Sequence, residues 1–293
     1  MVVTRKKLLF IINPISGGKE KKDFEKRSAQ FLDADLFEAQ YRFSEKPGHA
    51  AELTQQAISD SYDVVVAVGG DGTINEVART LVNTSVVLGI IPEGSGNGLA
   101  GYLEIPMIMK EAILLLNKFR VKRIDSGKLN DHYFFNMAGI GFDAVISDRF
   151  DKDSIRGPFG YMKTVVSEIG HYKAEDYEFV IDGKHYKEEA FMISLANSPQ
   201  YGNNAYVSPN ASVSDGLLDV CIVKPFPLFL LPKMLFHLFS RTTDKSGYVD
   251  IIRGKEILIR REKEGYVHVD GQPIHLGKDL RCSILPSSLC IIY

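Results

Sequence analysis

Three strand-like segments at residues 7–12, 63–68 and 86–91, each apolar apart from a charged first residue in the first two, alternate with amphipathic segments in the N-terminal part of the chain. Continuous runs, rather than runs interrupted by polar residues, are typical of strands that are covered on both faces. Strands that alternate with helices predict an open parallel sheet with right-handed crossovers. We therefore expect an α/β domain with strands at residues 7–12, 37–43, 63–68 and 86–91 and helices at residues 23–32, 49–59, 74–82 and 107–118.

Three glycine-rich segments each follow one of these strands directly. They are NPISGGK after residue 12, GGDGT after residue 68 and PEGSGNG after residue 91. The carboxyl ends of parallel strands meet at one edge of a sheet, and ligands bind outside that edge. We therefore expect the three segments to gather there and to form a binding site.

The GGDGT segment has the features of a phosphate-binding loop. Gly69 and Gly70 allow another group to approach the backbone closely, and the N-terminus of the helix that follows attracts phosphate. Thr73 would cap that helix or donate to a phosphate oxygen. The alternative is a tight turn without a ligand.

Two better-known phosphate-binding motifs are not found in the sequence. The P-loop pattern is absent. The Gly-x-Gly-x-x-Gly pattern at residues 96–101 lacks the context of a dinucleotide fingerprint because it follows a late strand.

The pattern changes near Arg123. Beyond it the sequence predicts mostly antiparallel strands, and the pair Asp182–Gly183 is a strong signal for a hairpin turn. We expect strands at residues 177–181, 184–187, 191–195, 218–223, 256–260 and 266–269. This divides the chain into an α/β nucleotide-binding domain at residues 1–123 and a β-rich sandwich domain at residues 124–285, with the apolar segment at about 286–293 expected to pack back on the first domain.

The composition narrows the class of protein. A net charge of −2 in 293 residues argues against a nucleic-acid-binding protein. Cys221, Cys282 and Cys290 are too few and too scattered for a disulfide framework or a metal cage, so we expect reduced thiols in a cytoplasmic protein. No apolar stretch reaches the roughly 18 residues of a spanning helix, so we expect membrane contact to be peripheral.

The order of the motifs resembles that of the diacylglycerol kinase catalytic-domain family, which includes bacterial lipid kinases and the sphingosine and ceramide kinases. The matching segments are NPISG at 13–17, SEKPGHA at 44–50, GGDGT at 69–73, PEGSGNGLA at 92–100, IDSGKLN at 124–130, GIGFDA at 139–144, SPNASVSDGLLDV at 208–220 and VDGQ at 269–272. GGDGT alone is weak, because NAD kinases and phosphofructokinases have similar loops. The full set spans nearly the whole chain and is specific.

The resemblance implies that the first domain binds ATP. It assigns contacts with the nucleotide to Asn13, Ser16, Gly17, Ser44, Gly69, Gly70, Asp71, Gly72, Thr73, Glu76 and Ser95. Glycine backbone, short hydroxyl groups and helix N-termini suit the spread negative charge of phosphates. An acid repels phosphate, so we expect Asp71 to face Mg²⁺ or a metal-bound water. A role for Asp71 as a helix cap is compatible with this.

Two further sites are implied for the second domain. By resemblance, Ser212, Asp215 and Leu217 bind a structural Mg²⁺ through the aspartate and neighbouring backbone carbonyl groups. A simple Asp-Gly turn is an equally good interpretation of that segment. Asp125 matches an aspartate that sphingosine kinases use near the lipid head group.

The catalytic-base motif of the family is Asp-Gly-Glu, and here it reads Asp270-Gly271-Gln272. Glutamine cannot accept the proton, so Asp270 is the expected catalytic base and would deprotonate the lipid hydroxyl. The alternative is that Asp270 only forms a hairpin turn, as Asp182 is expected to do. Asp125 is the next candidate for the base.

Residues 224–241 are rich in Leu and Phe and are flanked by positive charge. We expect a core helix of the second domain, because apolar helices in soluble domains are usually buried. An interfacial helix that dips into lipid head groups is the alternative, and a helix with one face lining a lipid tunnel is also open.

The expected function is that of an ATP- and Mg²⁺-dependent lipid kinase whose acceptor is a hydroxyl of diacylglycerol or of a sphingoid-type lipid. Its partner would be lipid at a membrane surface, with no nucleic acid, and a homodimer is left open. One alternative is a kinase for a soluble metabolite, of the NAD kinase type. Another is a catalytically inactive lipid-binding homologue, which Gln272 suggests.

Overall fold

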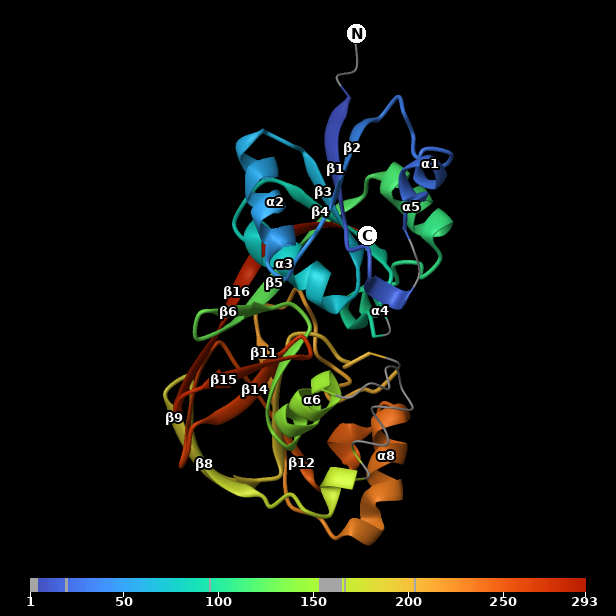
Figure 1. Ribbon diagram of the computed structural model, residues 1–293. Coiled ribbons are helices and arrows are strands. Elements are labelled where there is room, and N and C mark those ends of the chain that lie inside the picture. The colour runs from blue at the N-terminus through green and yellow to red at the C-terminus, as the bar shows by residue number, and fades with distance from the viewer. Residues whose placement is uncertain (1–4, 19–20, 95, 153–164, 166, 203) are drawn as a thin grey trace. The chain divides into compact units, whose positions relative to one another are not determined.

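The computed structural model of the chain describes residues 5–18, 21–94, 96–152, 165, 167–202 and 204–293. The chain divides into two compact units (Figure 1). Unit 1 comprises residues up to Ile124 together with Ser287–Tyr293, and unit 2 comprises Asp125–Pro286. Among the described residues, no helix combines the length and the apolar character needed to cross a bilayer.

Unit 1 is built on a parallel sheet. Its strands are β1 (Lys6–Ile12), β2 (Phe37–Phe43), β3 (Val64–Gly69) and β4 (Val87–Pro92), in the order β2-β1-β3-β4. The C-terminal part of β16 (Asp279–Ile292) adds to the edge of β4, with Ile291 opposite Leu88. Every residue of β3 is buried, as expected for a strand that is covered on both faces.

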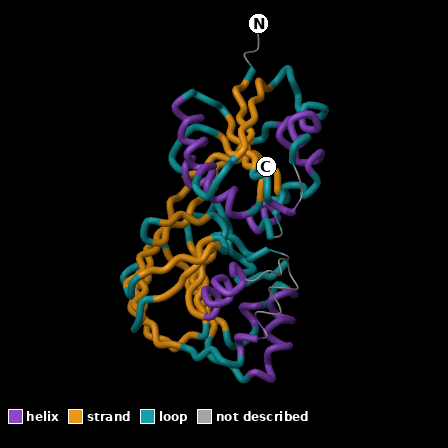
Figure 2. Tube along the Cα trace, in the orientation of Figure 1, coloured by secondary structure: helices purple, strands orange, loops and turns teal. Residues whose placement is uncertain are grey.

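Helices cover this sheet (Figure 2). They are η1 (Ser16–Gly18), α1 (Phe24–Ser28), α2 (His49–Ser59), α3 (Asp71–Leu81), α4 (Gly98–Tyr102) and α5 (Met109–Lys118). Helix α3 buries Ile74, Val77 and Ala78 at the helical spacing that the sequence shows. It begins at Asp71, three residues before the predicted start, so the second half of the GGDGT loop is already helical.

Unit 2 is β-rich. One antiparallel sheet has the order β12-β11-β10-β7-β14-β15, and strands β13, β8 and β9 and the N-terminal part of β16 form a second antiparallel layer. Strand β5 pairs with β6 and β16. The bounds are β5 Val121–Leu129, β6 His132–Phe134, β7 Met137–Gly141, β8 Glu175–Ile181, β9 Lys184–Ala190, β10 Met192–Ala196, β11 Leu218–Val223, β12 Val249–Gly254, β13 Glu256–Arg261, β14 Gly265–Val269 and β15 Gln272–Leu276.

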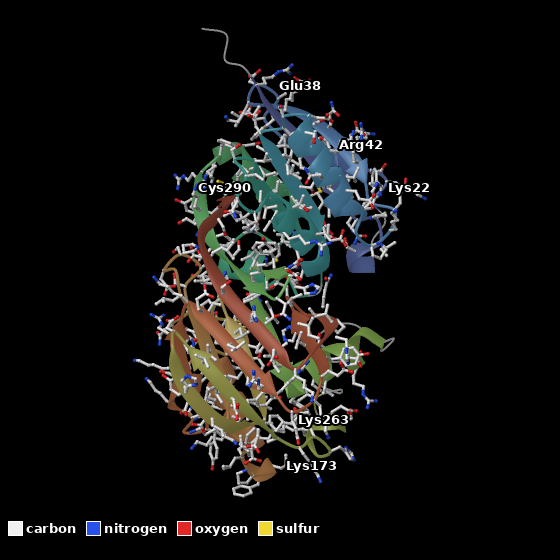
Figure 3. All side chains as sticks on the ribbon, turned by 90° about the vertical axis from the view of Figure 1, so that its left-hand side faces the viewer. Lys22, Glu38, Arg42, Lys173, Lys263 and Cys290 are labelled. Carbon is white, nitrogen blue, oxygen red and sulfur yellow. The ribbon has the colours of Figure 1, made fainter. Side chains whose placement is uncertain are left out.

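The two layers of unit 2 share one apolar core. It contains Phe134, Tyr177, Leu195 and Ile259, which come from strands of both layers. A parallel α/β unit followed by a β-rich unit confirms the predicted fold class. The buried thiol groups of Cys221, Cys282 and Cys290 are all free, and Figure 3 labels Cys290 on the part of β16 that belongs to unit 1.

The helical segments of unit 2 include α6 (Phe142–Lys152), η2 (Leu228–Leu230), α8 (Leu231–Phe239) and η3 (Thr243–Lys245). Helix α6 packs against β7, β10, β14 and β15. None of the residues of α8 is buried, so the expected core helix is not found. The helix lies on the surface of unit 2 because only one of its two apolar faces meets the rest of the unit.

Both Asp-Gly pairs form tight hairpin turns, as the sequence predicts. Asp182 and Gly183 have φ angles of 46° and 79°, and Asp270 and Gly271 have φ angles of 46° and 80°. Two successive positive φ angles are the mark of a type I′ turn. The turns join β8 to β9 and β14 to β15.

Candidate active site

The loop after β1 is tied to the loop after β3. Asn13 donates from its backbone to the carbonyl of Val68 over 3.0 Å and from its side-chain amide to the Thr73 hydroxyl over 3.0 Å. The carbonyl oxygen of the same amide accepts the backbone N–H of Ile15 over 3.1 Å. Asn13 therefore fixes its own loop and holds the Thr73 hydroxyl at the first turn of α3.

A buried lysine supports the NPISG loop. Lys21 is only 7% exposed, and its ammonium group donates to the carbonyl and the hydroxyl of Ser16 over 2.5 and 2.9 Å. Gly17 has φ of 65°, and a Cβ at this position would lie 2.5 Å from the carbonyl oxygen of Glu93. Only glycine fits where this loop meets the loop after β4. Lys21 had no predicted role, because it is one of several charged residues in this stretch of the sequence.

Asp71 joins the loop after β3 to the loop after β4. Its Oδ2 accepts the backbone N–H of Asn97 over 2.7 Å, and its Oδ1 accepts that of Gly98 over 2.9 Å. Gly98 is the first residue of α4, so Asp71 caps the N-terminus of a helix that lies one βα unit further along the chain. A Cβ on Gly96 would lie 2.8 Å from Asp71 Oδ2. The glycine lets the carboxylate reach both N–H groups.

The two glycine-rich loops also pack backbone against backbone. A Cβ on Gly94 would lie 2.5 Å from the Cα of Gly70, and a Cβ on Gly69 would lie 2.6 Å from the Thr73 side chain. Asn97 closes the second loop, because its side chain accepts the N–H of Gly94 and donates to the carbonyl of Gly94. The glycines of this region are thus required by close packing between loops.

Two further predicted residues of unit 1, Ser44 and Glu76, lie at the same edge of the sheet. Ser44 directly follows β2, and its backbone N–H donates to the carbonyl of Ile12 over 2.9 Å. Glu76 of α3 accepts the backbone N–H of Gly48 over 2.9 Å, at the start of α2. Ser95 lies outside the described residues. The edge therefore brings together loop backbone, short hydroxyl groups and the N-terminal end of α3, which carries partial positive charge.

In unit 2, Asp270 is held by the backbone that links β6 to β7. Its carboxylate accepts the N–H groups of Phe135, Asn136 and Met137 over 3.0, 2.9 and 3.1 Å. Its own N–H donates to the carbonyl of Met137 over 2.9 Å. Three backbone donors stabilise the ionised carboxylate and fix its orientation.

Asp182 offers a comparison, because it occupies the same position in a turn of the same type. Its carboxylate also accepts backbone N–H groups, those of Lys255 and Glu256, over 2.9 to 3.1 Å. Hydrogen bonding from the backbone is therefore a general property of the Asp-Gly turns of this chain. Asp270 differs from Asp182 in the side chains that surround its turn.

A buried cluster of polar side chains lies beside the Asp270 turn. His268 Nε2 is 2.9 Å from Asp143 Oδ2, and the hydroxyl of Tyr201 donates to the same oxygen over 2.6 Å. The hydroxyls of Tyr201 and Ser194 are 2.5 Å apart. A Cβ on Gly139 would lie 2.2 Å from the His268 ring and 2.3 Å from Asp143. Because Gly139 of β7 has no side chain, His268 and Asp143 can approach each other at this position.

Charge and burial act in opposite directions on His268. Burial lowers its pKa, but the Asp143 carboxylate, and more weakly that of Asp270, raise it, and the net shift is upward. The ring N–H does not point along the line to Asp143 Oδ2, so the contact is not a linear hydrogen bond, and it becomes an ion pair when the ring is protonated. On the other side of the ring, Nδ1 accepts the backbone N–H of Gly271 over 3.3 Å.

The sequence did not reveal this cluster. Asp143 lies in the GIGFDA motif, and His268 directly precedes VDGQ, yet neither had a predicted role. Alternation along β14 was the available signal, because it places His268 and Asp270 on the same face. Helix α6 supplies a further contact, since the hydroxyl of Ser147 donates to the carbonyl of Gly271 over 2.7 Å.

Asp125 lies against the predicted metal loop. It is 1% exposed, and its Oδ2 accepts the backbone N–H of Gly216 over 2.7 Å. Its own N–H donates to the carbonyl of Val213. Asp125 thus supports the 212–217 loop from beneath.

The residues of this loop fit a magnesium ion poorly. Arg253 lies 3.4 Å from Oδ2 of Asp215, and Leu217 directs its N–H toward Oδ1 of the same carboxylate over 3.1 Å. The hydroxyl of Ser212 faces that of Ser214 over 3.4 Å. A guanidinium group, which also pairs with Asp219 over 2.9 Å, therefore lies beside the only carboxylate of the proposed ligand set. Within the described ranges, no three His, Cys, Asp or Glu side chains are grouped to hold a metal ion.

Comparison with known families gives two matches that follow each other along the chain. Residues 7–129 match the model of the diacylglycerol kinase catalytic domain, and residues 136–293 match that of the YegS C-terminal NAD kinase beta sandwich-like domain. A protein of Pectobacterium atrosepticum named as a probable lipid kinase YegS-like is 30% identical over 96% of this chain and 94% of its own length.

Two further proteins are similar over most of their length. A diacylglycerol kinase of Staphylococcus saprophyticus is 29% identical over 92% of this chain and 89% of its own. The crystal structure of a putative diacylglycerol kinase from Bacillus anthracis superposes with a TM-score of 0.82 at 24% identity, over 99% of this chain and 97% of that one. At that identity the superposition supports the fold alone.

Proposed function

The chain belongs to the diacylglycerol kinase family of lipid kinases, and from this premise we propose that it transfers the γ-phosphoryl group of ATP to a hydroxyl group of diacylglycerol or of a sphingoid-type lipid. The observation that carries the proposal is the joining of three glycine-rich loops in unit 1 by Asn13 and Asp71. A rigid edge of backbone and hydroxyl groups suits a phosphate chain better than it suits any uncharged ligand.

Unit 1 would bind the nucleotide. Thr73 and the first turn of α3 would face the phosphates, and the loops at Asn13–Gly17 and Ser44 would border the rest of the nucleotide. ATP enters as its magnesium complex, since the phosphoryl group in flight carries charge that a divalent cation offsets. Asp71, at the same edge, would help to position that complex while it holds α4.

Unit 2 would supply the acceptor side. The lipid oxygen attacks the γ-phosphorus, the bond from that phosphorus to the β-bridging oxygen breaks, and ADP leaves. The hydroxyl proton passes to Asp270, whose carboxylate is held in one orientation by three backbone donors. In a loose transition state the lipid hydroxyl loses its proton late in the reaction. A carboxylate held in one orientation is therefore sufficient to accept that proton. Asp125 acts through the 212–217 loop, because its carboxylate is buried against Gly216.

The enzyme would work at the cytoplasmic face of a membrane, where its acceptor resides. The rival function is phosphorylation of a soluble metabolite. It is favoured by one observation, the match of unit 2 to a domain described as NAD kinase-like. An inactive lipid-binding protein is the other rival, since Gln272 replaces the second acid of the family motif.

A panel of acceptors tests the proposal. Purified protein is incubated with γ-labelled ATP, Mg²⁺ and, in separate reactions, diacylglycerol, ceramide, sphingosine, NAD or no acceptor. Label in the organic phase with one of the lipids supports the proposal. Transfer of label to NAD alone would establish the soluble-metabolite rival. If none of the tested acceptors becomes labelled, the result would support the inactive homologue.

A further inference from the structure

Helix α8 and the η2 turn before it expose a stripe of aromatic side chains. Phe229 is 80% exposed, Phe236 67% and Phe239 49%. With Pro232, which is also exposed, they recur every three or four residues and so share one face of the helical segment. Leu228, 52% exposed, lies beside the first of them. A soluble helix normally turns such a face inward, and this one turns it to the outside.

The opposite face of α8 is fixed to unit 2. Leu231 packs against the cluster that contains Phe142 and Phe191, and Met234 packs against the cluster that contains Cys221 and Val249. The helix is therefore apolar on both sides, with one side anchored in the unit. The exposed aromatic stripe therefore belongs to a helix that is held in place by its opposite face.

The charges around the stripe are positive, although the chain as a whole is slightly acidic. Residues 224–245 contain Lys224, Lys233, Arg241 and Lys245 and one acid, Asp244, whereas the whole chain has a net charge of −2. Lys233 lies next to the stripe on the helix surface, one turn from Phe229 and from Phe236.

Two of these four cations have fixed positions. The guanidinium group of Arg241 stacks on the ring of Tyr206, 4.2 Å from its centroid, and donates to the Tyr206 hydroxyl over 2.5 Å. Lys224 is paired with Asp250 over 2.7 Å, so it contributes little net charge. Lys233, Arg241 and Lys245 are the other three cations of this segment, and we refer to them as its cationic rim.

The exposed area of the stripe distinguishes between two candidates that could cover it, a membrane and a second copy of the chain. At roughly 200 Å² for a full aromatic side chain, the exposed parts of the four side chains amount to about 500 Å². A stable protein interface needs about 800 Å² from each partner. Phe and Leu on one face with Lys and Arg at the margin are, by contrast, the composition of helices that lie in the interface of an anionic bilayer.

We propose that the surface formed by Leu228, Phe229, Phe236 and Phe239, with Lys233, Arg241 and Lys245 at its rim, docks unit 2 onto an anionic lipid bilayer. The aromatic rings enter the boundary between head groups and acyl chains, and the cations meet the phosphate groups of the lipids. This inference rests on the proposed function, because docking gives a lipid kinase access to an acceptor that does not leave the membrane.

The chain contains no tryptophan, so a single introduced indole reports on one position. Phe236→Trp places it in the stripe, and Tyr266→Trp places it at another exposed aromatic position of unit 2 as the matched control. With vesicles of phosphatidylcholine and phosphatidylglycerol, we expect the emission of Phe236→Trp to move to shorter wavelength and to be quenched by brominated acyl chains. Tyr266→Trp should show neither effect. Equal responses of the two variants, or none, would overturn the proposal.

A second experiment measures binding and turnover separately. The triple variant Phe229→Ser, Phe236→Ser, Phe239→Ser should sediment with these vesicles at least about tenfold less than the wild type. Its turnover of lipid embedded in vesicles should fall in parallel, whereas turnover of a short-chain lipid below its micelle concentration should not change. The double variant Ile108→Ser, Leu114→Ser removes exposed apolar groups from unit 1 and should behave as wild type.

The outcomes distinguish this inference from the function on which it rests. A wild type that binds vesicles through the stripe but phosphorylates no lipid would leave the surface established and the proposed function refuted. A triple variant that binds vesicles like the wild type would refute the surface alone. A wild-type dimer that the triple variant converts to a monomer would identify a second copy of the chain as the occupant and would also refute the proposal.

Discussion

The Oδ2 atom of Asp71 accepts the backbone N–H of Asn97 over 2.7 Å, so the acid in the first glycine-rich loop holds the second loop in place. An acid among groups that are proposed to bind phosphate would repel that ligand, so we expect the acid to have another role. Here that role is visible, because Asp71 also caps α4 through Gly98. The charge of Asp71 is thus partly offset by backbone donors before any nucleotide arrives.

Replacement of Asp71 should therefore affect both chemistry and stability. Asp71→Ala removes the acceptor for two backbone donors and should lower the free energy of unfolding by about 1–3 kcal/mol. Turnover should fall by at least about two orders of magnitude, as expected for a positioned active-site group. Urea unfolding and steady-state kinetics measure the two effects. Asp71→Asn keeps an acceptor oxygen, so a stable but inactive Asp71→Asn would assign the activity to the charge. Wild-type turnover in both variants would reduce Asp71 to a cap.

Gly17 and Gly18 form a matched pair for testing the nucleotide loop. Both have φ of 65°, but a Cβ on Gly17 would lie 2.5 Å from the Glu93 carbonyl oxygen, whereas a Cβ on Gly18 meets nothing within 4 Å. Gly17→Ala and Gly18→Ala share the backbone strain of about 1 kcal/mol. Only Gly17→Ala should also displace the loop and raise the KM for ATP. The same KM in both variants would show that this contact does not shape the nucleotide site.

Asp270 and Asp182 form a second matched pair. Asp270→Asn and Asp182→Asn each weaken backbone hydrogen bonds in a type I′ turn, so both should lower stability to a similar extent. Turnover should fall by about two to four orders of magnitude in Asp270→Asn alone, with little change in ATP affinity. If the two variants lose activity equally, Asp270 is only a turn residue and the base lies elsewhere.

Gln272 provides a separate test of the broken motif. It is exposed at the start of β15, one residue beyond the Asp270–Gly271 turn. Gln272→Glu should change turnover only modestly if the wild type is already an active kinase, because Asp270 then carries the proton transfer. An inactive wild type that becomes active as Gln272→Glu would instead identify the chain as a degenerate family member. Lipid phosphorylation by both proteins at equal concentration decides between the two.

The pKa of His268 makes a prediction about pH. Because Asp143 raises this pKa above its usual 6.5, protonated His268 stabilises the folded protein. That contribution is complete below pH 6.5 and is lost as pH rises through the folded pKa. The difference in unfolding free energy between wild type and His268→Gln should thus be larger at about pH 5.5 than at about pH 8.5. A difference that grows with pH would mean that the Gly271 contact, which needs an unprotonated Nδ1, outweighs Asp143.

The sequence predicted the framework of the fold because its signals are local. Strands β1, β3 and β4 are continuous apolar runs, and the Asp-Gly turns at 182 and 270 have one favoured geometry. The start of α3 was placed too late because the glycines of GGDGT disfavour helix on their own, whereas packing against Gly94 and Asn97 stabilises it.

The side-chain clusters could not be predicted, because they form between distant segments. The Asp143–His268 pair joins residues separated by more than 120 positions in the chain, and nothing local marks it. Helix α8 was expected in the core because apolar composition does not distinguish a helix that is buried on all sides from one that leaves an apolar face exposed. The position of Arg253 beside Asp215 likewise depends on the pairing of β11 with β12, so the predicted metal site at Asp215 stays a prediction.

Transfer of label from ATP to lipid tests the central claim most directly. Wild-type protein, Mg²⁺ and vesicles that contain diacylglycerol or a sphingoid-type lipid are incubated with ATP labelled either at the γ-phosphate or at the α-phosphate, and the lipids are extracted. We predict that label enters the extracted lipid from γ-labelled ATP alone, that chelation of Mg²⁺ abolishes the transfer and that Asp71→Ala does not support it. No label in any lipid from an intact, ATP-binding protein would contradict the assignment as a lipid kinase.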